Sequence, residues 1–506
     1  MARWGEFKWG TAKWGAVPVE RRLTWYFGVD WFDNGLLDGH NDGRKAFYLE
    51  TSNGRQYFLD NAGSGFQPVE SGKITIKIRD DEGKYDPYNP ASPYYGNLVP
   101  GKKFELRVRR EDTGSLEWVM IGKITDVRPS DGSARTVTIK GENDVQLLKK
   151  KRIYSPVMTS YRYNEAIEDI LVRAGWAQGI NVDGIISDTM PYWWADGKEG
   201  FYEIQSLVDA AIGRFFVAED GTARYMSRLS DDLSVTIIRA EHIDYGYGVK
   251  KTQPWESVRN VVRVYARARN PVANQVLWEL SESVQLLPGE TKKIGASFAL
   301  NQQPVPASNV YNLIATSDYL ANTASDGSGS DKTASVAIVS MNKFSTSAII
   351  TFQNNDVEAI YLTWVRVRGD AIVVDPYTFA EEIDAGSVFD EQMLELKSDW
   401  LQSMNDAIEA SRNLLGVLST PRIFPRIKFR NLPEKQFGIK LFDMVTFDIP
   451  EKLLSGDMRV GYITHKSISP TLDVFDTEMQ FEPTLTGNIS GSWMFPAVFG
   501  VTTIFA

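Results

Sequence analysis

The sequence predicts a mainly β fold with α+β portions, and three observations lead to this class. Apolar residues alternate with charged or hydroxyl residues in several short segments, for example at Ile74, Ile76 and Ile78, as expected for half-buried strands. Two stretches between residues 163 and 212 repeat apolar residues at helical spacing instead. Turn signals rich in Gly, Pro and Asp separate the strand-like segments, so we expect antiparallel sheets with a helical part between them.

Composition limits the class of protein further. The 506 residues are 43% hydrophobic and 24% charged, which is enough to bury several cores. The 55 basic and 65 acidic residues give a formal net charge of −10, without a basic stripe along the chain. A protein that reads a nucleic-acid sequence is therefore not expected. Because the chain has no cysteine, disulfides, thiolate nucleophiles and cysteine metal sites are excluded.

Residues 1–60 are interpreted as an N-terminal arm. The arm opens with three five-residue units that each begin with Trp-Gly, at Trp4, Trp9 and Trp14. A period of five fits neither a helix nor a strand, so these side chains cannot share one face of a regular element. We expect them to dock on a neighbouring chain, and the alternative is an aromatic stack against the first domain. A signal peptide is not expected, because no apolar run follows the basic residues.

Residues 61–150 are expected to form a first small antiparallel β-barrel, with strands near residues 73–79, 103–109, 118–124 and 136–140. A loop at residues 81–101 interrupts it. Four prolines restrict the backbone of this loop, so it can be rigid without regular hydrogen bonding. The loop either projects and presents its tyrosines to a partner or lies over its own barrel. The candidate partner-binding tyrosines are Tyr85, Tyr88, Tyr94 and Tyr95.

The following segments alternate between helical and strand patterns. Residues 151–245 are expected to form an α+β domain with helices at 163–176 and 201–212 and a hairpin at 214–226. Residues 271–385, rich in strands and turns, are interpreted as an inserted β-sandwich. A helix is expected at 386–414, with an apolar side that runs from residue 390 to 418.

A second small antiparallel β-barrel is expected from residues 246–270 together with 415–485. In it, residues 261–264 would pair with strands near 427–429, 444–447, 458–463 and 478–481. Residues 486–506 form an apolar tail that is too short for a bilayer and contains Pro496 and Gly500, so stable membrane insertion is not expected. We expect other subunits or a partner to bury its aromatic residues, which include Trp493, Phe495, Phe499 and Phe505.

Motifs for catalysis are missing from the sequence. Only His40, His242 and His465 occur, none with a metal-ligand neighbour at helical spacing, and HExxH, GxSxG, GxxxxGK[ST] and GxGxxG are absent. We therefore assign no catalytic, cofactor-binding or metal-binding residue and expect no enzymatic activity. The cluster Tyr192-Trp193-Trp194 is able either to stack on sugar rings or to pack against a neighbouring helix. It gives an alternative function, a host-surface carbohydrate-binding tail adhesin.

Three segments together resemble a known family. They read KYDPYNPASPYYGNLVPGKKFELRVR from residue 84, GRFFVAEDGTARYMSR from residue 213 and ESVRNVVRVYARARNP from residue 256. In this order they resemble the tail-hub or minor tail proteins of long-tailed bacteriophages, and the Trp-Gly repeat is similar to the repetitive starts of some phage minor tail proteins. Such hubs resemble the baseplate hub of contractile phages, with two tube-like β-barrels in each subunit.

The resemblance implies a structural role without enzymatic activity. A homotrimer would cap the tail tube, adapt its sixfold symmetry to threefold symmetry and gate the exit of DNA and tape-measure protein during infection. Its expected partners are a distal tail or tail tube protein ring, the tape-measure protein and a tail fibre or receptor-binding protein. The expected location is the distal end of the virion tail, after assembly in the host cytoplasm.

Overall fold

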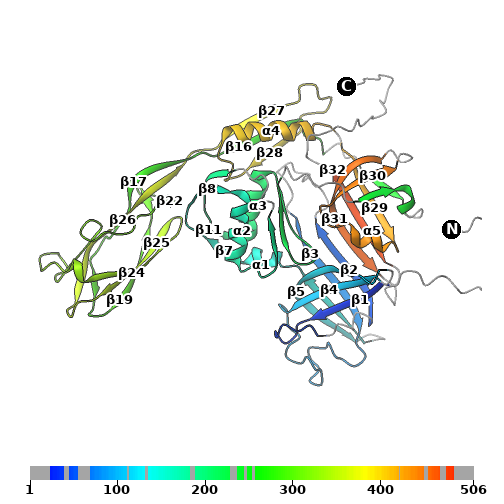
Figure 1. Cartoon of the computed structure of the whole chain (residues 1–506), viewed down its shortest axis with the longest axis horizontal. Coiled ribbons are helices and arrows are strands. Elements are labelled where there is room, and N and C mark those ends of the chain that lie inside the picture. Colours follow the sequence, from blue (N-terminus) through cyan, green and yellow to red (C-terminus); the bar gives the residue numbers. More distant parts are fainter. Residues whose placement is uncertain are drawn as a thin grey trace, which may run out of the picture.

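The computed structural model describes residues 23–38, 45–54, 69–110, 113–131, 135–182, 189–227, 236–243, 248–252, 257–420, 422–449, 454–467 and 475–483. The molecule is elongated, with a large sheet at one end, helices in the middle and a β-sandwich at the other end (Figure 1). This arrangement confirms the predicted mainly β fold with α+β portions and an inserted sandwich.

The large sheet contains twelve strands in two halves. Its path runs β1-β4-β5-β6-β3-β2-β31-β32-β29-β15, and β30 joins β31 to β14. The first half-sheet contains β1 (Leu23–Val29), β2 (Ala46–Gly54), β3 (Glu70–Arg79), β4 (Lys103–Arg110), β5 (Leu116–Asp131) and β6 (Arg135–Glu142). The second half-sheet contains β14 (Thr236–Arg239), β15 (Val249–Thr252), β29 (Phe424–Arg430), β30 (Met444–Ile449), β31 (Leu454–Ser467) and β32 (Asp476–Pro483), with α5 (Pro433–Gly438) beside them.

Direct pairing between β2 and β31 joins the two half-sheets. The antiparallel register places Leu49 opposite Ser467 and Thr51 opposite His465. Each half buries its own apolar core, because alternate side chains of its strands point to the same side. The two expected barrel regions are therefore parts of one continuous hydrogen-bonded sheet.

The first half-sheet begins upstream of the expected boundary at residue 61. Both β1 and β2 lie within residues 1–60, which were interpreted as an arm, and they pair with β4 and β3. The reason is the alternation of Trp25, Phe27 and Val29, which are all buried in the first core. The Trp-Gly repeat of the arm lies outside the described residues.

The central part contains the predicted helices and hairpin. Helix α2 (Tyr163–Ala174) begins where the Glu165 carboxylate accepts a hydrogen bond from the Arg162 backbone N–H (3.0 Å), and it ends at Gly175 with φ 81°. The other elements are α1 (Val145–Lys150), β7 (Arg152–Tyr154), β8 (Met158–Arg162), β9 (Ile180–Val182), β10 (Thr189–Trp193), β11 (Asp196–Glu199), α3 (Gly200–Ala211), β12 (Arg214–Val217) and β13 (Ala223–Met226).

Two expectations for the adjoining segment were wrong. Strand β16 (Val261–Ala266) does not pair with the second half-sheet; it lies between β27 (Thr378–Ile383) and β28 (Met393–Lys397) under helix α4 (Met404–Leu418) (Figure 1). Val262 and Val264 thereby pack in the core that includes α4. The expected helix also starts too early, because Leu394 and Leu396 alternate with charged residues in β28.

The β-sandwich is connected to this three-stranded sheet through β17 (Arg269–Glu279), which follows β16, and β26 (Ile360–Val374), which precedes β27. One layer contains β17, β18 (Val284–Leu286), β22 (Ala307–Ser308), β23 (Tyr319–Asn322) and β26. The other layer contains β19 (Thr291–Ser297), β24 (Val336–Lys343) and β25 (Ser347–Asn354), and β20 (Ala299–Leu300) pairs with β21 (Gln303–Pro304). The layers enclose a separate apolar core, so the sandwich projects as a distinct body (Figure 1).

Candidate partner-binding surfaces

The proline-rich loop between β3 and β4 is fixed by its own side chains. The buried Asp80 carboxylate accepts hydrogen bonds from the backbone N–H groups of Lys84 (2.7 Å) and Tyr85 (2.9 Å). Further along, the Asn89 side-chain amide donates to the Gly83 carbonyl oxygen (2.9 Å). The loop therefore holds a defined shape without strand pairing, as its prolines suggested.

The four tyrosines of the loop divide into an inner and an outer pair. Tyr85 and Tyr94 are buried, with ring centroids 5.6 Å apart, and both rings contact Trp31, which is fully buried. Tyr88 and Tyr95 are 83% and 53% exposed. Only the outer pair offers surface to a partner, so the loop both covers its own core and presents two tyrosines.

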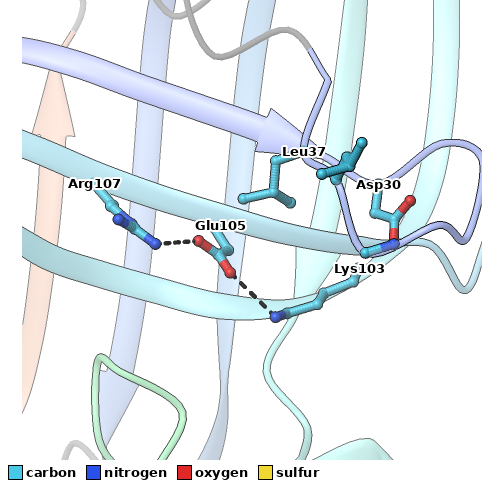
Figure 2. A pocket seen from close by; sticks show the side chains of 7 residues that line it. Asp30, Leu37, Lys103, Glu105 and Arg107 are labelled. Atoms are coloured by element: carbon cyan, nitrogen blue, oxygen red, sulfur yellow. Dashed lines mark hydrogen bonds and ion pairs between the residues drawn. The ribbon is translucent and has the colours of Figure 1, made fainter.

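A pocket of ≈ 410 Å³ lies beside the edge of the first half-sheet (Figure 2). Its floor carries Glu105, whose carboxylate lies 2.6 Å from the Arg107 guanidinium and 3.1 Å from the Lys103 ammonium. Asp30 in its wall accepts hydrogen bonds from the backbone N–H groups of Asn34 and Gly35. Both carboxylates thus interact with neighbouring residues of the protein and hold the walls of the pocket in place.

His465 lies at the junction of the two half-sheets. Its ring stacks on Phe437 (5.4 Å) and Phe475 (5.5 Å), and its Nδ1 lies 2.8 Å from the Thr477 hydroxyl. Trp25 of β1 contacts both phenylalanines. Burial lowers the pKa of His465 to about 3, so the ring is neutral at physiological pH. The ring therefore has a structural role at this junction.

The aromatic cluster after Pro191 faces the interior. Trp193 is fully buried and stacks on Tyr161, and Trp194 is 8% exposed. The Arg269 guanidinium, at the start of the sandwich, lies 4.4 Å from the Trp194 ring centroid and 4.1 Å from that of Trp400. Because the two tryptophans are covered, they offer no stacking face to a sugar ring. The packing interpretation is confirmed for both.

One buried carboxyl group has a strongly shifted pKa. Burial raises the pKa of Glu203 on α3 to about 7. Because its side chain is almost completely covered, a substrate in solution has no access to the carboxyl group in this conformation. Within the described parts of the chain, no cluster of three His, Asp or Glu residues is placed to hold a metal ion. No described helix is both long enough and apolar enough to cross a membrane.

The remaining candidates lie outside the described residues. They are the arm residues Trp4, Trp9 and Trp14 and the tail residues Trp493, Phe495, Phe499 and Phe505. They stay predictions of partner contact.

Two solved tail proteins are similar to this chain over nearly its whole length. The tail protein from Neisseria meningitidis MC58 matches with a TM-score of 0.50 and 9% identity, covering 91% of this chain and 96% of its own. The 43 kDa tail protein of prophage MuSo2 from Shewanella oneidensis matches with a TM-score of 0.50 and 8% identity, covering 92% of this chain and 99% of its own. The fold is that of a phage tail protein. Neither a protein-family model nor the sequence of a curated protein matches the chain.

The tail-protein fold agrees with the resemblance found in the sequence motifs. All three motifs lie mainly in described elements: the proline-rich loop with β4, the hairpin of β12 and β13, and the segment that contains β16. At this level of identity the shared property is the fold, and the role of this chain in a tail follows as a proposal.

Proposed function

We propose that this protein is the structural hub at the distal tip of a phage tail, where three copies cap the tail tube. The observation that carries the proposal is the continuous sheet that joins two separate cores in one subunit. Three copies supply six half-sheets, so a threefold assembly matches a sixfold tube without a second hub protein.

The edges of the sheet support contact between copies. Within the described residues, β1 pairs only with β4, and β15 pairs only with β29. Each of these two strands thus lies at an end of the sheet, where a strand of another chain can be added, and at one of these ends Val29 of β1 already exchanges backbone hydrogen bonds with Asp38. We assign these two edges to the interfaces between neighbouring subunits.

Other surfaces are assigned to the remaining tail partners. Tyr88 and Tyr95, fixed on a rigid loop, are suited to contact the distal tail or tail tube ring, because rigid aromatic residues supply contact area at little entropic cost. The sandwich projects away from the large sheet (Figure 1) and is assigned to a tail fibre or receptor-binding protein. The apolar tail, residues 486–506, remains a candidate seal of the channel that gates the exit of DNA and tape-measure protein.

Labelling of intact particles tests the proposed location. Antibodies against this chain, viewed on negatively stained virions, are expected to bind only at the distal end of the tail. Labelling along the tail shaft would instead indicate a tube protein, and labelling at the capsid end would contradict the proposed function. An antibody against the major tail tube protein provides the control for access to the particle surface.

A further inference from the structure

The strand registers show which side chains of the first half-sheet face away from its core. Ile76 of β3 lies opposite Ile139 of β6, and both are buried in the core. Because side chains alternate along a strand, Lys77 and Lys140 lie on the other face. The registers of β4 with β5 and of β5 with β6 assign the residues of these strands to one face or the other in the same way. Each of these two pairings contains one β-bulge, which shifts the alternation by one residue.

This outer face is strongly basic, although the chain as a whole has a formal net charge of −10. Four acidic residues lie on it, Glu50, Glu105, Asp126 and Glu142. The basic residues, which define what we call the basic face, are Lys73, Lys77, Arg79, Lys103, Arg107, Arg109, Lys123, Arg128 and Lys140.

The acidic residues of this face are already engaged. Glu50 pairs with Lys466, and Glu105 pairs with Lys103 and Arg107. Asp126 pairs with Arg128, and Glu142 accepts a hydrogen bond from Gln146. Five exposed cations, by contrast, form no ion pair with any residue that the structure describes. They are Lys73, Arg79, Arg109, Lys123 and Lys140.

The second half-sheet differs in this respect. On its corresponding face, Asp476 pairs with Lys428 and Arg430, and Glu478 pairs with Arg426. Most charges there neutralise one another across adjacent strands, and Lys250 of β15, opposite Arg426, is an exposed cation without an ion pair to a described residue. Exposed cations without an ion pair are thus more numerous on the first half-sheet, which makes its outer face the better electrostatic match for a polyanion.

We propose that the basic face binds the phosphate backbone of duplex DNA without reading its sequence. A face four strands wide measures about 15 Å across the strands, at about 4.8 Å between neighbours, so it is too broad to enter the major groove and to reach base edges. Lysine and arginine on it contact phosphates instead. The choice of DNA over an acidic protein rests on the proposed function, because the genome leaves the particle through the tail tip.

Two matched double variants test this proposal on the purified full-length chain. K73Q/K140Q removes two exposed cations of the basic face, and K292Q/K293Q removes two exposed lysines of the sandwich. Binding to a short random-sequence duplex is measured by fluorescence anisotropy between about 50 and 200 mM salt. We expect K73Q/K140Q to weaken binding about tenfold and to reduce the slope of log K against log salt by about 2, while the control behaves like the parent chain.

Three results would overturn the proposal: no binding of duplex by the parent chain at the lowest salt, equal weakening by both variants, or stronger binding of poly-glutamate than of DNA at equal charge concentration. The last result would identify an acidic protein segment as the occupant. Thermal unfolding of both variants, expected to match that of the parent, verifies that binding is compared between folded proteins. The particle labelling described above tests the hub function separately, so a hub that does not bind DNA is distinguishable from a protein that is no hub.

Discussion

Replacing Tyr94 by alanine is expected to lower the free energy of unfolding by about 3 kcal/mol, whereas the same change at its neighbour Tyr95 leaves it within about 0.5 kcal/mol. Tyr94 is 6% exposed and its ring packs against Trp31 (5.8 Å) and Tyr85 (5.6 Å). Its truncation leaves a cavity in the first core. Tyr95 is 53% exposed and loses little packing. Urea unfolding followed by tryptophan fluorescence measures both values.

The outer pair of tyrosines is expected to behave in the opposite way during assembly. Y88A/Y95A is expected to keep the stability of the parent chain but to reduce incorporation into tails, because exposed aromatic residues contribute mainly to interfaces. Complementation of a phage that lacks the protein, with quantification of the chain in purified tails, provides the measurement. Normal incorporation of Y88A/Y95A would show that these two residues do not belong to the partner-binding surface. A large loss of stability would show that Tyr88 and Tyr95 are packed in the protein and not exposed.

The second large effect is the pH dependence of stability that His465 introduces. The pKa of His465 is lowered to about 3 in the folded protein, against an ordinary value of 6.5. Well above pH 6.5 the ring is neutral in both the folded and the unfolded state, so its titration does not change the free energy of unfolding. As the pH falls from 6.5 towards 3, His465 becomes protonated in the unfolded chain but stays neutral in the folded chain. The free energy of unfolding therefore decreases progressively, by about 4 kcal/mol in total.

The variant His465→Phe separates this effect from other acid-sensitive groups. Phenylalanine preserves stacking between Phe437 and Phe475 and removes the titratable ring. Relative to the parent chain, it is expected to gain stability as the pH falls from 7 to 4, by about 3 kcal/mol, on top of a pH-independent loss of the contact with Thr477. Urea unfolding at each pH measures this difference. Parallel profiles for parent and variant would show that His465 is not buried in the neutral form.

Local patterns predicted the strands well where one period dominated. Ile74, Ile76 and Ile78 alternate cleanly, and they lie in β3 with their side chains in the core. The segment before α4 was misread because its apolar residues fit both periods: Leu394 and Leu396 belong to a strand, while Leu414 belongs to the helix that follows. Tertiary pairing with β16 decides between the two conformations.

Long-range pairing is what the sequence could not reveal. Glu50 and Lys466, which form an ion pair between β2 and β31, are 416 residues apart, and no local signal connects them. The same holds for the basic face. Lys73, Lys123 and Lys140 are spread over three strands among acidic residues, so the chain shows no basic stripe until the sheet brings alternate side chains together.

The tyrosines of the proline-rich loop show both what the sequence predicts and what it does not. The tyrosine-rich loop was identified from its prolines and aromatic residues, but burial separates Tyr85 and Tyr94 from Tyr88 and Tyr95, and such burial depends on Trp31 of another segment. A residue type alone does not show which side of a loop faces the core.

A three-dimensional reconstruction of the assembled tail tip tests the central claim most directly. We expect three copies of this chain at the distal end, with their six half-sheets in one ring around the channel and the edges of β1 and β15 paired between neighbouring copies. Six copies of the chain in one ring, or a tip in which the two half-sheets of a subunit lie in different layers, would contradict the proposal that each subunit spans two positions of the sixfold tube.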